Sequence, residues 1–230
     1  MISISNRLQD ILTTIQSAQL SEHAARSVNL LAVSKAQSAL AIREAYAASQ
    51  IMFGENYLQE ALDKQSQLTD LAIEWHFIGP IQSNKTQLIA QNFSWVHSID
   101  RLKIAQRLND ARAENLPPLQ VCIQLNISNE TSKSGITPQQ LEALATALTK
   151  LPQLKLRGLM AIPEPSKDYN KQRLQFKQVR ECYDNLIVKG FALDTLSIGM
   201  SDDYVIAIEQ GATIVRIGSA LFGARKYQAQ

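Results

Sequence analysis

The sequence predicts one α/β domain, residues 1–230, folded as an eight-stranded (β/α)8 TIM barrel with an extra helix at the N-terminus. Eight short apolar segments alternate with seven amphipathic ones, which is typical of parallel strands joined by right-handed helical crossovers. Eight such units fill a chain of 230 residues, a length that suits one closed barrel. Neither a Gly/Ser-rich linker nor a shift in composition marks a domain boundary. An open, doubly wound sheet is the alternative topology.

The predicted strands are short and rich in aliphatic and aromatic residues. They are LLAVSK (30–35), IMFGEN (51–56), EWHFIG (74–79), WVHSID (95–100), QVCIQLN (120–126), KLRGLMAI (155–162), TLSIGMS (195–201) and TIVRIGSALFG (213–223).

Helical periodicity appears before the first strand and between the others. One face of the opening helix carries apolar side chains at Ile4, Leu8, Ile11, Leu12 and Ile15. Further helices are predicted over SALAIREAYAAS (38–49), PQQLEALATALTKL (138–151) and RLQFKQVRECYDNLIVKG (173–190). Thr137-Pro138 is a start signal for the second of these, and Lys189-Gly190 is a stop signal for the third.

The composition excludes several classes of protein. The net charge of +2, the lack of a basic run and an aromatic content of 6% argue against a nucleic-acid partner. No apolar run reaches membrane-spanning length, and the first residues do not resemble a signal peptide. Cys122 and Cys182 lie far apart, which predicts reduced thiols and no metal site. We therefore expect a cytoplasmic protein that contacts neither nucleic acid nor membrane.

Polar residues stand at the ends of several predicted strands. They are Lys35, Glu55-Asn56, Ser98, Asn126 and Ser201. In a parallel barrel the C-terminal strand ends meet at one rim, where the active sites of such barrels lie. The pattern therefore predicts a polar site at this rim, although each residue alone could simply begin a loop.

The last two strands carry the residues that a phosphate site needs. Gly199 and Ser201 follow the seventh strand, and Gly218 and Ser219 follow the eighth. Glycine lets the backbone approach closely, free N–H groups donate to phosphate oxygens, and a hydroxyl adds a donor. Barrels often bind phosphate at this corner, so we expect a phosphorylated ligand there.

Strand alternation places Lys35 and Arg216 relative to this corner. Leu31, Val33 and Lys35 share one face of the first strand, and Arg216 shares a face with Gly218. Arg216 should then lie under the body of the ligand. Three interpretations of Lys35 remain open: a charge partner for phosphate, an amine nucleophile activated by apolar surroundings, or a lysine that extends to solvent.

Seven segments carry a further signal: LLAVSK, FGENYLQEALDK, EWHFIGPIQSNK, VHSIDR, QLNISNETSKSG, LRGLMAI and LSIGMSDDYVIAIEQGATIVRIGSALFG. Together they resemble the pyridoxal phosphate homeostasis protein family, from about Leu30 to Arg225. Proteins of this family look like the N-terminal barrel of alanine racemase standing alone. The longest motifs, WHFIGPIQSNK and GMSDD followed by VRIGSALFG, are the most specific.

The resemblance implies a binding role for six residues toward pyridoxal 5′-phosphate (PLP). By that likeness Lys35 would form an internal aldimine, Ser201, Gly218 and Ser219 would hold the phosphate, Arg216 would contact the pyridine nitrogen, and Asn56 would line the pocket near the ring.

Three positions qualify the resemblance. Ser219 stands where many relatives have threonine, and the hydroxyl is kept. Gln37 replaces a second lysine that relatives often carry in an SKTK sequence, which argues against transfer of cofactor between those two positions. Lys133 matches another family lysine near the rim, but it could equally be a solvated loop charge.

The residue expected at the pyridine nitrogen bears on the chemistry. A carboxylate there would keep the nitrogen protonated and make the ring an electron sink, whereas Arg216 would not. The resemblance thus implies a PLP-binding protein of intracellular vitamin B6 homeostasis that holds the reactive aldehyde, with apo-enzymes as recipients. Two alternatives are a racemase of low activity, with Tyr57 as a second acid/base group, and an aldolase-like lyase in which Lys35 binds a sugar phosphate. Since the second domain of alanine racemase has no counterpart here, we expect a monomer.

Overall fold

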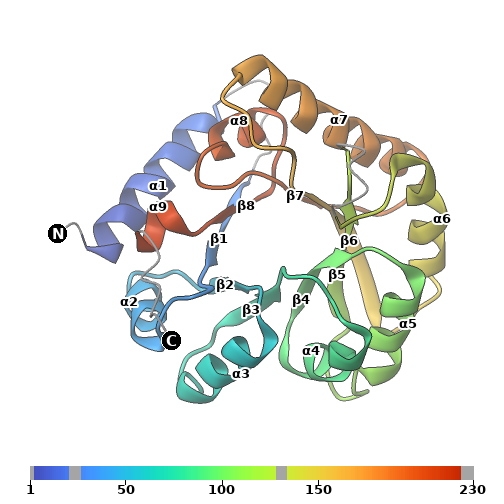
Figure 1. The fold of residues 1–230 in the computed structure, drawn as a ribbon, viewed down its shortest axis with the longest axis horizontal. Helices are drawn as coiled ribbons and strands as arrows, with labels where there is room; N and C mark the ends of the chain where they lie inside the picture. The colour runs from blue at the N-terminus through green and yellow to red at the C-terminus, as the bar shows by residue number, and fades with distance from the viewer. Residues whose placement is uncertain (1–2, 21–26, 128–133, 224–230) are drawn as a thin grey trace.

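The computed structural model describes residues 3–20, 27–127 and 134–223. Its eight parallel strands form a closed barrel in chain order, with the last strand paired to the first (Figure 1). The strands are β1 (Asn29–Val33), β2 (Met52–Glu55), β3 (Glu74–Phe77), β4 (Trp95–Ile99), β5 (Leu119–Leu125), β6 (Leu154–Ala161), β7 (Thr195–Ser197) and β8 (Ile214–Ile217). The predicted barrel is confirmed, and the open sheet is excluded by the β1–β8 pairing.

Helices surround the barrel and connect successive strands (Figure 1). They are α2 (Ala39–Ala47), α3 (Leu58–Gln67), α4 (Thr86–Asn92, after the 3-10 turn η1, Ser83–Lys85), α5 (Leu102–Ala111), α6 (Pro138–Leu148), α7 (Tyr169–Val188) and α8 (Tyr204–Glu209). The predicted extra helix, α1 (Ile4–Ala18), packs against α2, α8 and the short α9 (Ser219–Phe222). None of the helices in the described ranges is long and apolar enough to cross a membrane.

Local sequence signals fix several helix ends. The Ser38 side chain accepts a hydrogen bond from the Ala41 amide (3.2 Å) and begins α2. At α6, the Gln140 side chain accepts from the Thr137 amide (3.1 Å), and Pro138 is the first helical residue. Helix α7 ends before Gly190, whose φ is +92°, as the Lys189-Gly190 signal predicts.

The structure corrects some predicted boundaries. Strand β1 ends at Val33, so Lys35 lies in the following turn. Strand β8 ends at Ile217, and residues 219–222 form α9 instead of continuing the strand, since Gly218 adopts helical ψ and caps that helix. In α1, Leu12 is 40% exposed, whereas the other four predicted apolar positions are buried.

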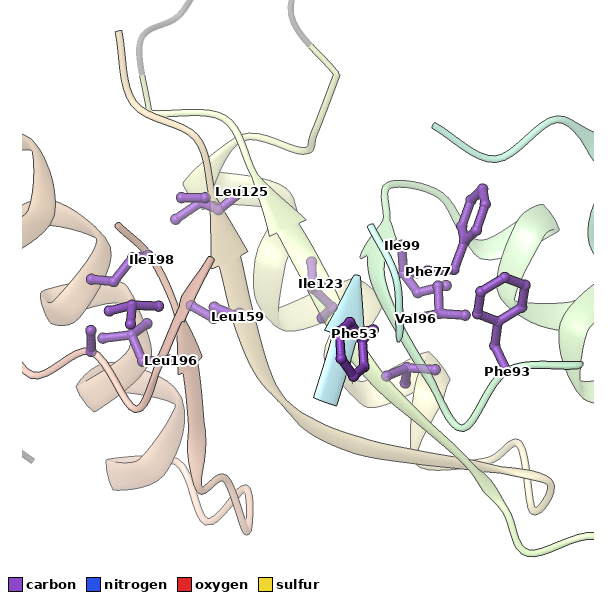
Figure 2. Close-up of a cluster of buried hydrophobic side chains, with 14 of the residues drawn as sticks. Phe53, Phe77, Phe93, Val96, Ile99, Ile123, Leu125, Leu159, Leu196 and Ile198 are labelled. Carbon is purple, nitrogen blue, oxygen red and sulfur yellow. The ribbon is translucent and has the colours of Figure 1, made fainter. Parts of the chain in front are cut away.

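Most of the apolar core lies between the strands and the helices. Figure 2 shows part of it: Phe77 and Phe93 lie beside Val96, while Leu196 and Ile198 lie on another side of the barrel. All five of these side chains are buried. This outer layer holds the helices onto the barrel.

The barrel interior does carry polar groups. His97 of β4 lies 2.9 Å from the Ser197 hydroxyl of β7, although these strands are not neighbours in the barrel. Arg216 of β8 donates to the Ala161 carbonyl of β6 (2.9 Å), and β7 lies between these two strands. Side chains of the inner faces make both contacts, so a polar network occupies the space inside the strands.

Candidate functional site at the C-terminal end of the barrel

The turn that carries Lys35 follows β1 directly. Lys35 is half-buried, and the next residue, Ala36, has a φ of +58°, a left-handed conformation that costs a non-glycine residue about 1 kcal/mol or more. The Ser34 carbonyl accepts from the Gln37 amide (3.0 Å), and the Ala36 amide donates to the Glu60 carboxylate (2.6 Å). The turn is therefore fixed on both sides of Lys35.

Glu60, which accepts from the Ala36 amide, belongs to a buried ion-pair cluster beside this turn. We call this cluster the Lys64 network (Ser34, Glu55, Glu60 and Lys64). Lys64 of α3 donates to the Ser34 carbonyl (2.7 Å), to Glu55 (2.8 Å) and to Glu60 (2.5 Å). The Ser34 hydroxyl also donates to Glu55 (2.6 Å). Burial raises the pKa of the Glu55 carboxyl, and the contact with Lys64 opposes that rise.

The position of Glu55 at a strand end predicted that it lies at the rim with the other polar groups. Its side chain instead lies in the Lys64 network. The alternation of β2 gives the reason: Gly54 faces Leu31 of β1, so Glu55 faces the opposite side, toward α3. The neighbouring Asn56 has the same parity as Gly54. Gly54 pairs with Val33, so Asn56 and Lys35 each lie two residues beyond a paired position on adjacent strands.

Asn56 carries one of the unpaired polar atoms of the described residues. Its side chain is half-buried, and its Oδ1 atom is buried without a hydrogen-bond partner. An orphaned acceptor costs about 1–3 kcal/mol, and a ligand donor would relieve that cost. This observation fits the predicted role of Asn56 in lining a pocket.

The predicted phosphate residues lie together between β7 and β8. The Ser201 hydroxyl accepts from the Ala220 amide in the first turn of α9 (3.4 Å). Ser219 begins that helix and is exposed, and Gly218 caps it. A Cβ atom on Gly218 would lie 3.2 Å from the Val33 carbonyl oxygen, so the chain passes close to the end of β1. The first amides of a helix lack acceptors within the helix, which suits an anion here.

Gly199 makes this corner possible. Its φ is +90°, and a Cβ there would lie 2.6 Å from the Cβ of Ala207 in α8. Its carbonyl accepts from the Arg216 amide (3.0 Å), which ties the end of β7 to β8. Asp203 closes the following turn by accepting from the Met200 amide (2.6 Å). Only glycine allows this turn to pack against α8.

Arg216 is buried at the base of the same corner. Its guanidinium donates to the Ser197 carbonyl (2.5 Å), the Ser197 hydroxyl (2.9 Å) and the Ala161 carbonyl (2.9 Å). Burial lowers the pKa of the Arg216 guanidinium to about 10, so it remains charged at neutral pH. Within the described part of the chain no carboxylate pairs with it directly. The guanidinium has five N–H donors, and these bonds use three of them.

A chain of polar side chains leads from Ser197 through the barrel interior; we call it the histidine chain (Ser197, His97, His76 and Glu74). The Ser197 hydroxyl lies 2.9 Å from His97 Nδ1, and His97 Nε2 lies 2.8 Å from His76 Nδ1. His76 Nε2 lies 2.8 Å from the Glu74 carboxylate. Burial lowers the pKa of both imidazoles, most strongly that of His97, and the hydrogen bond to His76 lowers the pKa of Glu74.

Neither the histidine chain nor Lys64 was predicted from the sequence. Two signals were present: His76 and His97 each occupy an inner strand position in an otherwise apolar segment, and Lys64 follows Glu60 by one helical turn. Tyr57 is 59% exposed at the start of α3. Ser98 is buried and donates to the Gly79 carbonyl (2.6 Å), so its hydroxyl serves the β3–β4 connection. Lys133 lies outside the described residues.

Comparison with known proteins identifies the family. The alanine racemase N-terminal domain family matches residues 15–226. A pyridoxal phosphate homeostasis protein of Pseudomonas aeruginosa is 56% identical over 230 residues, which is 100% of this chain and 99% of that protein. The chain belongs to the pyridoxal phosphate homeostasis protein family. The resemblance stated from the motifs is thereby confirmed.

A further relative and two solved structures extend the comparison. The Escherichia coli pyridoxal phosphate homeostasis protein is 54% identical over 203 residues, 87% of each chain. The structure of PipY of Synechococcus elongatus with PLP bound has a TM-score of 0.85 at 38% identity, covering 96% of this chain and 100% of PipY. An alanine racemase of Corynebacterium glutamicum shares the fold, with a TM-score of 0.70 at 18% identity over 100% of this chain and 63% of the racemase.

Proposed function

We propose that the chain binds PLP at the C-terminal end of the barrel, as a Schiff base on Lys35, and takes part in intracellular PLP homeostasis without substantial turnover. The observation that carries this proposal is the corner formed by β7, β8 and β1. There, the Ser201 hydroxyl accepts from the first turn of α9, Arg216 is buried on β8, and Gly218 passes close to Val33, two residues before Lys35. The names of the relatives and the PLP bound to PipY support the same ligand.

The residues present fit this cofactor. PLP offers a phosphate, a ring nitrogen and an aldehyde that reacts reversibly with amines. Ser201, Gly218 and Ser219 provide hydroxyl and amide donors for the phosphate, and Arg216 offers a charged donor to a ring nitrogen. The unpaired Oδ1 of Asn56 is an acceptor for a ligand donor. Lys35 supplies the amine from a turn held by Glu60 and Lys64.

Arg216 also bears on turnover. An arginine donates to a ring nitrogen without giving it a proton, so the ring does not become a strong electron sink. We therefore propose that α-proton abstraction from amino acids is slow, and that sequestration of a reactive aldehyde is the main role. We further propose that residues 1–230 act as one PLP-binding domain, that the protein is a cytoplasmic monomer, and that apo-enzymes receive the cofactor.

Absorbance spectroscopy tests the binding proposal. The purified protein, saturated with PLP, should show a visible band of a protonated imine, and Lys35→Ala should abolish it. Lys177→Ala, at a lysine whose side chain is 61% exposed on α7, is the matched control and should keep the band. Borohydride reduction followed by peptide mass analysis should locate the cofactor on Lys35. A colourless wild-type protein, or label at another lysine, contradicts the proposal.

Proton exchange separates binding from racemase activity. Amino acids incubated with the loaded protein in deuterated water should exchange their α-proton far more slowly than the rates of about 1–10³ per second typical of enzymes. Exchange at such rates would favour the low-activity racemase or a true enzyme. Reduction of a sugar phosphate onto Lys35 in the absence of PLP would favour the lyase. Size-exclusion chromatography with light scattering gives the molar mass of the protein in solution and so tests the proposed monomer.

A further inference from the structure

The histidine chain joins the two ends of the barrel. Glu74 is the first residue of β3, at the N-terminal end of the strands, whereas Arg216 is one residue from the end of β8. The four side chains between solvent and Arg216 come from β3, β4 and β7, and each contacts the next at 2.8–2.9 Å. The rings of His76 and His97 and the Ser197 side chain are fully buried.

The donors and acceptors of this chain can be assigned from its two ends. Arg216 donates to the Ser197 hydroxyl, because a guanidinium has no acceptor. The hydroxyl proton is then directed to His97 Nδ1 at 2.9 Å. His97 must carry its own proton on Nε2 and donate to His76 Nδ1, and His76 donates from Nε2 to Glu74. In this arrangement every buried polar group has a partner.

The reverse arrangement leaves two groups unsatisfied. If His97 donated from Nδ1 to Ser197, the buried hydroxyl would accept twice and its proton would have no partner among these residues. His76 Nε2 would then need a proton from Glu74, although the Glu74 side chain is 42% exposed and its pKa lies below the usual value. An imidazolium at either position would be a buried charge, which desolvation opposes.

We propose that Glu74, His76, His97 and Ser197 are positioning residues, forming a one-way hydrogen-bond chain that holds the guanidinium of Arg216 as a charged donor at the cofactor site. All the dipoles of the chain point the same way, with their negative ends toward Arg216 and their positive ends toward the Glu74 carboxylate. Aligned hydrogen bonds polarise one another, so the carboxylate acts on a guanidinium that it does not touch. This inference rests on the proposed function only for the identity of the ligand.

The outer end of the chain is open to solvent. Glu74 lines a cavity of about 670 Å³ at the N-terminal end of the barrel, together with Trp95, Gln120 and Arg157. The Trp95 ring stacks on His76 (5.3 Å between centroids), and the Arg157 guanidinium lies 4.7 Å from the Trp95 centroid. The charge of Arg157 also helps to lower the pKa of the Glu74 carboxyl, after the hydrogen bond to His76. Glu74 can therefore be changed at the surface without opening the apolar layer around the strands.

Nitrogen NMR of the cofactor-free protein tests the direction of the chain. The sequence has three histidines, so a variant with His23→Asn leaves only the two rings of interest. Long-range ¹H–¹⁵N spectra should show both rings neutral and protonated on Nε2 between about pH 7 and pH 8, above the ordinary histidine pKa. A proton on Nδ1 of either neutral ring, or an imidazolium at pH 7, overturns the assignment.

Glu74→Gln tests the transmission along the chain. The amide keeps an acceptor for His76 but lacks the charge, so the Nε2-bound proton of His97 should shift upfield although His97 does not touch residue 74. Asp70→Asn is the matched control, because Asp70 is also an exposed carboxylate, shortly before β3, but pairs with Arg43 of α2. An unchanged His97 signal in Glu74→Gln, or an equal shift in both variants, overturns the inference.

The same pair of variants tests the effect on the cofactor site. Glu74→Gln should raise the dissociation constant for PLP about threefold to tenfold and move the absorbance maximum of the bound cofactor, while Asp70→Asn changes neither. Equal affinity and spectrum in Glu74→Gln and wild type overturn the inference. If the wild-type protein binds no PLP, the proposed function fails, whereas the NMR result still decides the direction of the chain.

Discussion

Two buried polar networks support the candidate site from opposite faces of the barrel wall. The Lys64 network lies on the helix-facing side of β1 and β2, next to the turn of Lys35. The histidine chain lies inside the barrel and ends at Arg216. Each network holds one buried cation. Lys64 is in direct contact with the carboxylates of Glu55 and Glu60. Arg216 is separated from the Glu74 carboxylate by the neutral side chains of the histidine chain.

This difference has an energetic consequence. A buried cation in contact with a carboxylate depends on that partner, because loss of either ion leaves an uncompensated charge. Arg216 instead contacts two carbonyls and one hydroxyl, so no single contact neutralises it. The Lys64 network should therefore be sensitive to removal of one ion, and the histidine chain should be sensitive to removal of a neutral link.

The largest effect is expected from Lys64→Met. The substitution keeps the aliphatic chain but leaves Glu55 buried without its cation, so the free energy of unfolding should fall by about 3–5 kcal/mol. Urea unfolding followed by circular dichroism measures it. Lys177→Met, at an exposed i,i+4 pair with Glu181, should cost less than about 0.5 kcal/mol. The double variant Glu55→Gln, Lys64→Met should be more stable than Lys64→Met alone. Additive losses would contradict the ion-pair interpretation.

A smaller loss is expected from His97→Phe. Phenylalanine fills the ring volume, but the Ser197 hydroxyl and His76 Nδ1 both lose a partner inside the barrel. Each unsatisfied buried group costs about 1–3 kcal/mol, and the Ser197 oxygen keeps its bond from Arg216, so the two losses together should lower the free energy of unfolding by about 2–4 kcal/mol. Urea unfolding is again the measurement. A variant as stable as wild type would show that the histidine chain does not contribute to folding.

The two networks should also respond oppositely to acid. The folded-state pKa of both histidines is lowered, so the unfolded chain binds more protons below about pH 6.5, and stability falls as the pH drops. Glu55 has a raised pKa, and that shift favours the folded state at lower pH. Each histidine can change the free energy of unfolding by at most about 1.4 kcal/mol per pH unit. As the pH is lowered from 7.5 to 5.5, the urea concentration at the unfolding midpoint should fall in the wild-type protein and fall less in His97→Gln. An equal dependence of the midpoint on pH in the two proteins would contradict this.

The same two networks mark the limit of what the sequence predicts. Strand alternation and the Gly-Ser turns predict the barrel and the corner at β7 and β8, because these depend on local periodicity and backbone geometry, whereas residues 219–222 were predicted as strand and form α9. The contact between His97 and Ser197 depends on which strands face each other across a closed barrel. Pairwise placement of that kind is a tertiary property. Glu55 illustrates the same limit, since its side chain faces α3 instead of the rim.

The smallest effect separates the two carboxylates of the Lys64 network. Glu60 is 31% exposed and bridges Lys64 and the Ala36 amide, whereas Glu55 is fully buried. Glu60→Gln should lower global stability by less than about 1 kcal/mol, because a partly exposed pair is screened by solvent. Its main effect should be local: hydrogen exchange of the Ala36 amide should quicken by up to about fivefold. Glu181→Gln, on the exposed face of α7, should leave that amide unchanged. Quickening throughout α3 instead would mean that Glu60 holds the helix and not the turn of Lys35.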